Sequence, residues 1–287
     1  MTDDRRSKTS WRIALAFSAI TLLIHLLTNS RYGYFRDELY FIACARHLAF
    51  GYVDLAPLSV LLLRVETICF GDSLFALRLF PAIAGALTVA LTAALAREMG
   101  GRTWAITLAC AAATGAIVCL ALGNFYSLNV FEPLFWMGCV YLLLRIINGA
   151  SPRLWLGFGV VAGLGVENKH SFVFFGVGLT AALFFTPLRR QLRMPWIWLG
   201  GLIAVLLALP NILWQMQHGW PTHELLNNIA HSNKNVVLTP LQFVLQQILI
   251  MNPATFPLWF GGLIWLFASR AGRRYYLLGI AYLITLA

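Results

Sequence analysis

Residues 74–96 read LFALRLFPAIAGALTVALTAALA, an apolar run in which Arg78 is the only charged residue. A helix needs about 20 mainly apolar residues to cross the hydrocarbon core of a bilayer, and this run meets that length. The rest of the chain is similar: 60% of its 287 residues are hydrophobic and only 11% are charged. A soluble domain carries about 25% charged residues. The composition therefore predicts an all-α integral membrane protein.

The same length criterion, applied on both sides of this run, predicts a polytopic helical bundle of about nine spans. The region 154–188 is too long for one span, so we divide it at the polar tetrad Glu167-Asn168-Lys169-His170. Pro253 and Pro257 interrupt 241–269, where we expect an interfacial helix followed by a span. The expected spans cover about 11–29, 74–96, 103–122, 131–148, two in 154–188, 195–214, 241–269, and a last one from near Tyr275. Because that last run is still apolar at Ala287, we expect the single domain 1–287 to be truncated at its C-terminus.

The basic residues predict the orientation of these spans. The N-terminal segment MTDDRRSKTSWR is basic, and the apolar run after it ends without the small-residue site of a cleaved signal peptide. We therefore expect an uncleaved first span with a cytoplasmic N-terminus in the plasma (inner) membrane, which places most of the 21 lysines and arginines on the cytoplasmic side, as the positive-inside rule requires. These are Arg5, Arg6, Lys8, Arg12, Arg97, Arg102, Arg145, Arg153, Arg189, Arg190, Arg193, Arg270, Arg273 and Arg274. Their short clusters between apolar runs explain the net charge of +10 without a nucleic-acid partner.

Most acidic residues fall on the opposite, outer side in this layout. They are Asp37, Glu38, Asp54, Glu66, Asp72, Glu132, Glu167 and Glu224. Acidic residues contribute little to topology, so membrane insertion does not explain their distribution. We expect two outer loops to carry chemistry or binding: 30–73, which contains short interfacial helices, and 215–239.

Three stretches with carboxylates are candidate sites, and each has an ordinary structural alternative. Asp37 and Glu38 are adjacent, so one could face a site while the other binds a cation; both could instead simply stabilise a helix N-terminus. Asp54 precedes Pro57 and could be a helix N-cap. Glu132, next to Pro133, fits the first turn of the span expected at 131–148, where it could act in a site or only complement the helix dipole.

Two further polar segments are candidates for phosphate or metal binding. Lys169 and His170 could bind a phosphate at the membrane surface, or lie in a polar turn where Glu167 pairs with Lys169. In the loop 215–239, His218, His223 and Glu224 lack the spacing of a zinc site, and the five cysteines show no CxxC. The chain also has no GxxxxGK[ST] motif and no GxGxxG in the required context.

Several of these stretches together resemble glycosyltransferase family 39, which includes the protein O-mannosyltransferases and the bacterial lipid A aminoarabinose and core-sugar transferases. The segments that carry the resemblance are Phe35-Arg36-Asp37-Glu38-Leu39-Tyr40, Tyr52-Val53-Asp54, Pro57-Leu58, Phe70-Gly71-Asp72-Ser73, Leu77-Arg78-Leu79, Gly163-Leu164-Gly165, Asn168-Lys169 and Gln217-His218-Gly219-Trp220-Pro221. The chain departs from many relatives in having Leu55-Ala56 before Pro57, where they carry His-Pro or Pro-Pro.

The resemblance implies a membrane glycosyltransferase with the GT-C fold that moves a sugar from a polyprenyl-phosphate donor to an acceptor hydroxyl at the outer face, with inversion. The acceptor would be lipid A or lipopolysaccharide, another glycan or a protein. It implies that 30–73 is the first catalytic loop, with Asp37 as general base, Glu38 as its partner and Glu132 as the second-loop acid. We expect Lys169, Arg78 and His170 to bind the donor phosphate, and Tyr40, Asp54 and Tyr126 to bind substrate. No cofactor is implied with certainty, and a divalent metal is left open.

The alternative from another functional class is a transporter or flippase for a lipid or a small anion. Such a protein would use buried charges as a substrate pathway, commonly at mid-span and with inverted repeats. Here the expected spans are nearly free of charge, and the ionisable residues collect at one side. This distribution favours the enzyme. A noncatalytic scaffold subunit would leave the acidic first loop unexplained.

Overall fold

The computed structural model describes residues 3–232 and 237–286, and its regular structure in those ranges is entirely helical. The expected all-α fold class is thus confirmed. The α-helices are α1 (Asp3–Thr28), α2 (Arg36–Arg46), α3 (Pro57–Phe70), α4 (Leu74–Leu77), α5 (Leu79–Glu98), α6 (Thr103–Gly115), α7 (Ile117–Leu122), α8 (Leu128–Ile147), α9 (Leu154–Asn168), α10 (Phe172–Phe184), α11 (Pro195–Gln217), α12 (Pro221–Ala230), α13 (Pro240–Ile250), α14 (Phe256–Ala268) and α15 (Tyr276–Leu286). Three 3₁₀-helices, η1 (Pro187–Arg193), η2 (Pro253–Thr255) and η3 (Gly272–Tyr275), join some of them.

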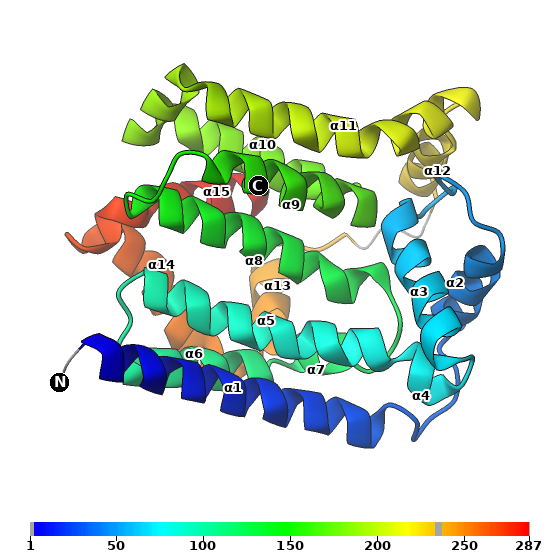
Figure 1. The fold of residues 1–287 in the computed structure, drawn as a ribbon, viewed down its shortest axis with the longest axis horizontal. Coiled ribbons are helices and arrows are strands. Elements are labelled where there is room, and N and C mark those ends of the chain that lie inside the picture. The colour runs from blue at the N-terminus through cyan, green and yellow to red at the C-terminus, as the bar shows by residue number, and fades with distance from the viewer. Residues whose placement is uncertain (1–2, 233–236, 287) are drawn as a thin grey trace.

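The long helices lie side by side, with α1 against α5, α8 against α5 and α9, and α9 against α11 (Figure 1). The short helices α2, α3, α4 and α12 gather at one end of this bundle (Figure 1). We call this the polar end; α1, α9 and α11 finish there and α8 begins there. The opposite end, where α5 and α8 finish and η1 and η3 lie, is called the basic end. The expected outer and cytoplasmic residues are thus separated onto two ends of one bundle.

Length and composition identify candidate membrane spans in the part of the chain that the structure describes. Four helical segments are long and apolar enough to cross a bilayer: Lys8–Thr28, Leu74–Glu98, Leu128–Ile147 and Pro195–Gln217. Up to six result if each of two bent helix pairs forms one span. The apolar helices α6 and α9 are shorter. Large apolar side chains on these helices are exposed, as expected for a surface that faces lipid. The expected total of nine spans stays a prediction.

Helices α9 and α11 approach closely through glycine. A Cβ atom on Gly159 would lie 2.0 Å from the carbonyl oxygen of Gly200, and one on Gly200 would lie 2.2 Å from that of Trp155. Small residues at such crossings let two backbones pack without side chains between them, which is common in membrane helix pairs. This contact holds the first half of α9 against the first half of α11.

The predicted break inside 154–188 is confirmed, and the region of the span expected at 103–122 contains a further break, which was not predicted. Helix α9 ends at Asn168 and α10 begins at Phe172, with Lys169 extended between them. The helix from Thr103 instead stops at Gly115, because Ala116 is extended before α7 begins. The Asn252 side chain, from far along the chain, donates a hydrogen bond to the Gly115 carbonyl. Such a partner satisfies a carbonyl that the helix end leaves free.

The two loops expected to lie outside both contain helices. Region 30–73 holds α2 and α3, so the expected short helices are present; the side of the membrane on which they lie stays a prediction. Region 215–239 holds α12, and its residues 233–236, with Lys234, lie outside the described residues.

Candidate functional site

The first turn of α2 separates the two adjacent carboxylates. Phe35 is extended, and α2 begins at Arg36. The Phe35 N–H donates a 2.8 Å hydrogen bond to Oε2 of Glu38, which satisfies one of the free donors at a helix N-terminus. The Glu38 side chain is fully buried, whereas 47% of the Asp37 side chain is exposed. The structure therefore fits the first of the two alternatives, in which the neighbouring carboxylates point in different directions: Glu38 binds a cation and Asp37 is open to solvent.

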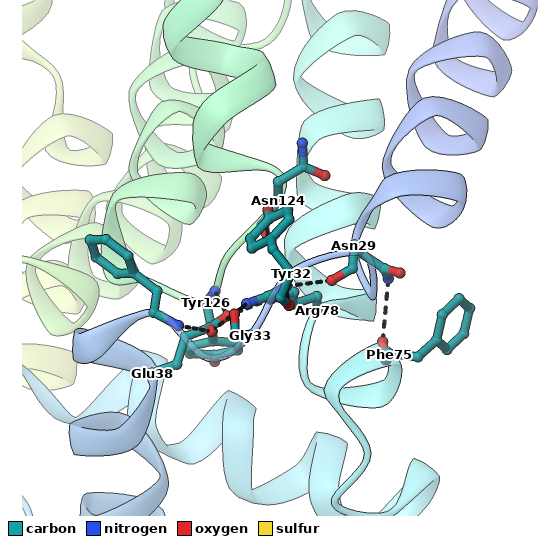
Figure 2. A network of polar contacts seen from close by, with 9 residues as sticks. Asn29, Tyr32, Gly33, Glu38, Phe75, Arg78, Asn124 and Tyr126 are labelled. Atoms are coloured by element: carbon teal, nitrogen blue, oxygen red, sulfur yellow. Dashed lines mark hydrogen bonds and ion pairs between the residues drawn. The ribbon is translucent and has the colours of Figure 1, made fainter.

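Glu38 binds Arg78, as Figure 2 shows. The Arg78 guanidinium donates from Nε to Oε1 at 2.7 Å and from Nη2 to Oε2 at 2.6 Å. Oε1 also accepts the backbone N–H of Tyr126 at 2.8 Å. Paired hydrogen bonds between arginine and a carboxylate are among the strongest in proteins, and burial makes each charge depend on the other. The pair thus connects three segments of the chain: α2, the junction of α4 and α5, and the loop before α8.

The remaining donors of Arg78 are also used within the protein. Its Nη1 donates to the carbonyls of Asn29 and Tyr32, and its Nη2 donates to that of Gly33 at 2.9 Å. The guanidinium carbon lies 4.4 Å from the centroid of the Tyr32 ring, a favourable cation–π distance. With no exposed surface and all five N–H donors engaged, Arg78 offers nothing to an external phosphate in this geometry.

Tyr126, whose N–H binds Glu38, is also buried in this group of contacts. Its side chain is fully buried, and its hydroxyl donates to the Ser59 carbonyl at 2.6 Å. Its ring packs edge-on against Phe41 and Phe131. The substrate-binding role predicted for Tyr126 thus has no accessible surface to support it, and the residue instead joins α3 to the loop before α8.

The exposed side of α2 carries Asp37 and Tyr40, which are three residues apart and so lie on one helix face. The Tyr40 hydroxyl donates a 2.6 Å hydrogen bond to Oδ1 of Asp54. Burial and, secondly, this hydrogen bond raise the pKa of the Tyr40 phenol, so it remains a proton donor. Asp54 is therefore tied to α2 rather than capping α3, whose N-cap residue Ala56 has no side-chain acceptor. Arg36 lies 3.2 Å from Asp37 but is 91% exposed, and an exposed pair of this kind is weak.

A second carboxylate–cation pair lies at the same end, between α8 and the segment after α9. Lys169 Nζ donates to Oε2 of Glu132 and to Oδ1 of Asn129, at 2.8 and 2.9 Å. Ser171 donates to the other oxygen of Glu132 at 2.8 Å. The side chains of Lys169 and Glu132 are 33% and 17% exposed, so this pair is accessible. The expected alternative pairing of Lys169 with Glu167 is not what the structure contains.

The position of Glu132 within its helix differs from the prediction. Helix α8 begins at Leu128 rather than near 131, so Glu132 lies in the second turn and Pro133 inside the helix. Dipole stabilisation is largest in the first turn, and this reading of Glu132 is therefore weakened. Its carboxylate oxygens accept hydrogen bonds from Lys169 and Ser171.

Helix α11 connects the second pair to the loop that carries Asp54. The His170 ring lies 2.9 Å from the Asn211 side chain, and Asn211 donates to the Phe50 carbonyl at 2.8 Å. One turn later, Gln215 donates to the Tyr52 carbonyl. A Cβ on Gly51, between these two contacts, would lie 2.3 Å from the Trp214 ring. The backbone before Asp54 is thus held against α11.

Asn211 and Gln215 were missed by the sequence reasoning, although a signal was present. Both are polar residues, four apart, inside the mainly apolar α11, and both are buried. Polar side chains on one face of a membrane helix commonly mark a contact or a site. Thr222 of α12, which donates to the Val53 carbonyl at 2.9 Å, belongs to the same network.

Glu66 of α3 is a buried carboxyl group without a cation. Its Oε1 accepts the Phe80 N–H at 2.6 Å, and its Oε2 has no partner. Burial raises the pKa of Glu66 to about 8, although the N–H groups of Phe80 and Leu79 oppose the shift. The Glu66 carboxyl group lies against the beginning of α5. There it accepts the Phe80 N–H, one of the backbone donors that a helix N-terminus leaves free.

The described residues contain no group of three or more His, Cys, Asp or Glu side chains placed to hold a metal ion. His218 stacks on the Trp214 ring with centroids 4.2 Å apart, and His223 lies 3.4 Å from the Asn227 side chain.

Comparison with known proteins gives one match. A family model described as dolichyl-phosphate-mannose-protein mannosyltransferase matches residues 54–214. No curated protein and no solved structure matched the chain. The matched segment includes Arg78, Glu132 and Lys169, whereas Asp37 and Glu38 precede it.

The family match agrees with the apolar helices and with the resemblance found in the sequence. It covers more than half of the 287 residues, and the predicted membership of a GT-C glycosyltransferase family is confirmed. The chain is therefore a multi-pass membrane protein of the dolichyl-phosphate-mannose-protein mannosyltransferase family.

Proposed function

We propose that the chain forms one glycosyltransferase domain that moves a sugar from a polyprenyl-phosphate donor to an acceptor hydroxyl, with Asp37 as the general base. The observation that carries the proposal is the exposed carboxylate of Asp37, held at the start of α2 by the buried Glu38–Arg78 pair, in a chain of this family. A donor with a polyprenyl phosphate is what the family description implies, since dolichol is a polyprenol.

The rigidity around Asp37 supports its assignment as base. A general base must be held within hydrogen-bond reach of the proton that it removes. Glu38, the next residue, is fixed by hydrogen bonds from Arg78, Tyr126 and Phe35, which come from three different segments. The α2 backbone is therefore held in place while the Asp37 side chain remains open. Glu38 and Arg78 are positioning residues in this account, which replaces the phosphate-binding role expected for Arg78.

The proposed step is a single displacement that balances without a further reactant. The acceptor hydroxyl gives its proton to Asp37 as its oxygen forms a bond to the anomeric carbon of the sugar. The bond from that carbon to the phosphate oxygen breaks, and the electron pair leaves with the polyprenyl phosphate. Attack opposite the leaving group inverts the anomeric carbon. Because phosphate leaves as a stable anion, no general acid is required, but a cation nearby lowers the barrier.

Lys169 is the cation that we assign to the phosphate. It is one-third exposed, at the polar end, and already oriented by Asn129 and Glu132. A lysine binds phosphate as a flexible point charge. His170, linked through Asn211 to the loop before Asp54, is assigned to the same side of the site. Tyr40 and Asp54 are assigned to the acceptor sugar or hydroxyl.

We infer that the polar end faces the outer side of the plasma (inner) membrane. The positive-inside rule supports this, because η1, η3 and the C-terminal turns of α5 and α8 carry arginines at the other end. Nucleotide sugars are not supplied outside the cell, so a lipid-linked donor suits this orientation. Lipid A or another component of lipopolysaccharide is an acceptor in keeping with it, as are other glycans and proteins.

The experiment is a transfer assay with the full chain reconstituted in liposomes. Radiolabelled sugars are supplied either on polyprenyl phosphates or on nucleotides, with cell envelope material as the source of acceptors. The proposal predicts transfer of label from at least one polyprenyl-phosphate sugar and none from nucleotide sugars alone. Transfer from a nucleotide sugar without lipid donor, or none from a full panel of polyprenyl-phosphate sugars, contradicts it.

A further inference from the structure

The 3₁₀-helix η1 at the basic end carries three arginines in seven residues, Pro187–Arg193. It is bent by 103° from α10, so it lies across the direction of the helix that precedes it. An arginine-rich segment that turns sideways at the end of an apolar helix has the position of a membrane-surface element. Phe185 and Trp198, beside η1 in the sequence, are exposed large aromatic residues, which are typical of the interface between water and lipid.

Two contacts fix the orientation of η1. The buried Trp155 of α9 donates from its indole to the Gln191 side chain, and Trp198 of α11 donates to the Leu192 carbonyl at 2.8 Å. With the middle of η1 held by these tryptophans, Arg189, Arg190 and Arg193 remain exposed. Their arrangement is therefore set by a packed backbone and not by a free loop.

A pocket of about 510 Å³ lies among these arginines. It is lined by Arg189, Arg190 and Arg193 together with Phe184 and Leu192. The lining thus combines three permanent positive charges with two apolar side chains. A phospholipid headgroup has the complementary form, since a phosphate is joined directly to an apolar glycerolipid.

The arginines of η1 are not neutralised within the described part of the protein. No ion pair joins Arg189, Arg190 or Arg193 to a carboxylate there. Arg145, at the same end, pairs with Glu98, and Arg274 donates to the Ile147 carbonyl. The positive-inside rule requires only that arginines be present, and it does not require three of them to converge on one pocket.

We propose that Arg189, Arg190 and Arg193, with Phe184 and Leu192, form a binding site for the phosphate headgroup of an anionic phospholipid. Arginine binds phosphate oxygens through paired N–H donors, and basic pockets beside membrane helices bind anionic lipid headgroups. Anchoring at this point would hold η1, and with it the α10–α11 connection, at the membrane surface. The site lies at the opposite end of the bundle from Asp37 and is independent of the proposed function.

Native mass spectrometry of the full chain in detergent, titrated with phosphatidylglycerol or phosphatidylcholine, tests the proposal. We expect a preference for phosphatidylglycerol, and we expect the triple variant R189Q/R190Q/R193Q to bind it about 10- to 100-fold more weakly. The matched control is R270Q/R273Q/R274Q, which removes the same charge from another cluster at the basic end and should keep the wild-type affinity. The variant R189K/R190K/R193K should bind with intermediate affinity, because it keeps the charge but loses the paired donors.

Three results overturn the proposal. The first is equal binding of the two lipids by the wild type. The second is an equal loss of affinity in both glutamine triple variants, which would indicate a general charge effect. The third is displacement of phosphatidylglycerol by an equal concentration of glycerol phosphate, which would indicate a soluble phosphate ligand. Circular dichroism and thermal unfolding in neutral detergent check that each variant is folded, and the lysine variant keeps the test decisive if the glutamine variant is not.

Discussion

Glu38 with Arg78, and Glu132 with Lys169, each join a carboxylate to a cation at the polar end, at 2.6 and 2.8 Å. In the first pair both side chains are fully buried, and the arginine has no donor left for another group. In the second pair the side chains are 17% and 33% exposed, and the lysine is accessible. The comparison shows that one carboxylate–cation pair is enclosed by the fold, whereas the other remains accessible to solvent at the same end.

The two cations differ in their surroundings as well as in their chemistry. Arg78 lies between α4 and α5, where backbone carbonyls of the turn after α1 surround its guanidinium. Lys169 is extended between α9 and α10, and its ammonium group donates hydrogen bonds to the side chains of Glu132 and Asn129. Breaking each pair separately should therefore give different results.

The largest effect is expected from breaking the buried pair. In Arg78→Met, Glu38 would remain buried without its cation, and removal of one member of such a pair costs about 3–5 kcal/mol. We expect a strong fall in thermal stability in detergent and low accumulation in the membrane. The matched control is Arg36→Met, which removes an arginine that is 91% exposed and should be nearly neutral. Equal unfolding temperatures for the two variants would contradict the structural role.

Glu66 extends the comparison to a buried carboxyl group with no cation at all. Its pKa is raised to about 8 in the folded protein, from an ordinary value of 4.5. The protonated form is therefore favoured by folding, and its stabilisation is complete below about pH 4.5 and is lost as the pH rises to about 8. The loss is on the order of 1 kcal/mol for each pH unit in that window.

The variant Glu66→Gln cannot ionise. Its unfolding temperature should therefore rise relative to that of the wild type as the pH increases from 5 to 8. Thermal unfolding of both proteins across this range measures the difference. A constant difference would show that Glu66 is ionised, or accessible to water, in the folded protein.

The open pair should affect the rate of transfer more than stability. In Lys169→Met, the loss of a positioned cation is expected to reduce sugar transfer about 10- to 100-fold. The unfolding temperature should change little, because a partly exposed pair contributes about 1 kcal/mol or less. Lys169→Arg should recover part of the rate, since it keeps the charge. If Lys169→Met lowered stability as much as Arg78→Met does, the Glu132–Lys169 pair would also be needed mainly for the fold, which would contradict this contrast.

A substitution at Gly51 tests whether the loop before Asp54 is packed against α11. An alanine there would bring its Cβ to 2.3 Å from the Trp214 ring, and overpacking of this kind costs about 1–3 kcal/mol. Gly33→Ala is the matched control, because nothing lies within 4 Å of the Cβ position there. Thermal unfolding should separate the two variants. A neutral Gly51→Ala would show that the loop before Asp54 is not held against α11.

Much of the fold follows from the sequence, because its signals are local. The apolar runs give the long helices, and four successive polar residues at 167–170 give the break between α9 and α10. The break after Gly115 has no such local signal, because the side chain that donates to the free Gly115 carbonyl is that of Asn252, far along the chain. The site divides in the same way: Asp37 and Glu38 are visible as a pair, but which of them is buried depends on Arg78, 40 positions away from Glu38. The phosphate-binding role expected for Arg78 comes from the family resemblance, and nothing in the sequence near Arg78 indicates that Glu38 is its partner.

The most direct measurement for the central claim is the transfer rate of Asp37→Asn, expressed per folded protein and compared with the wild type and with Glu224→Gln, a neutralised exposed carboxylate of α12 at the same end. Loss of a positioned base is expected to reduce the rate about 10²- to 10⁴-fold, while Glu224→Gln and the stability of both variants stay close to the wild type. Undiminished transfer by Asp37→Asn would contradict the assignment of the base, and with it the division of this polar end into an enclosed pair that holds the fold and an open region that does the chemistry.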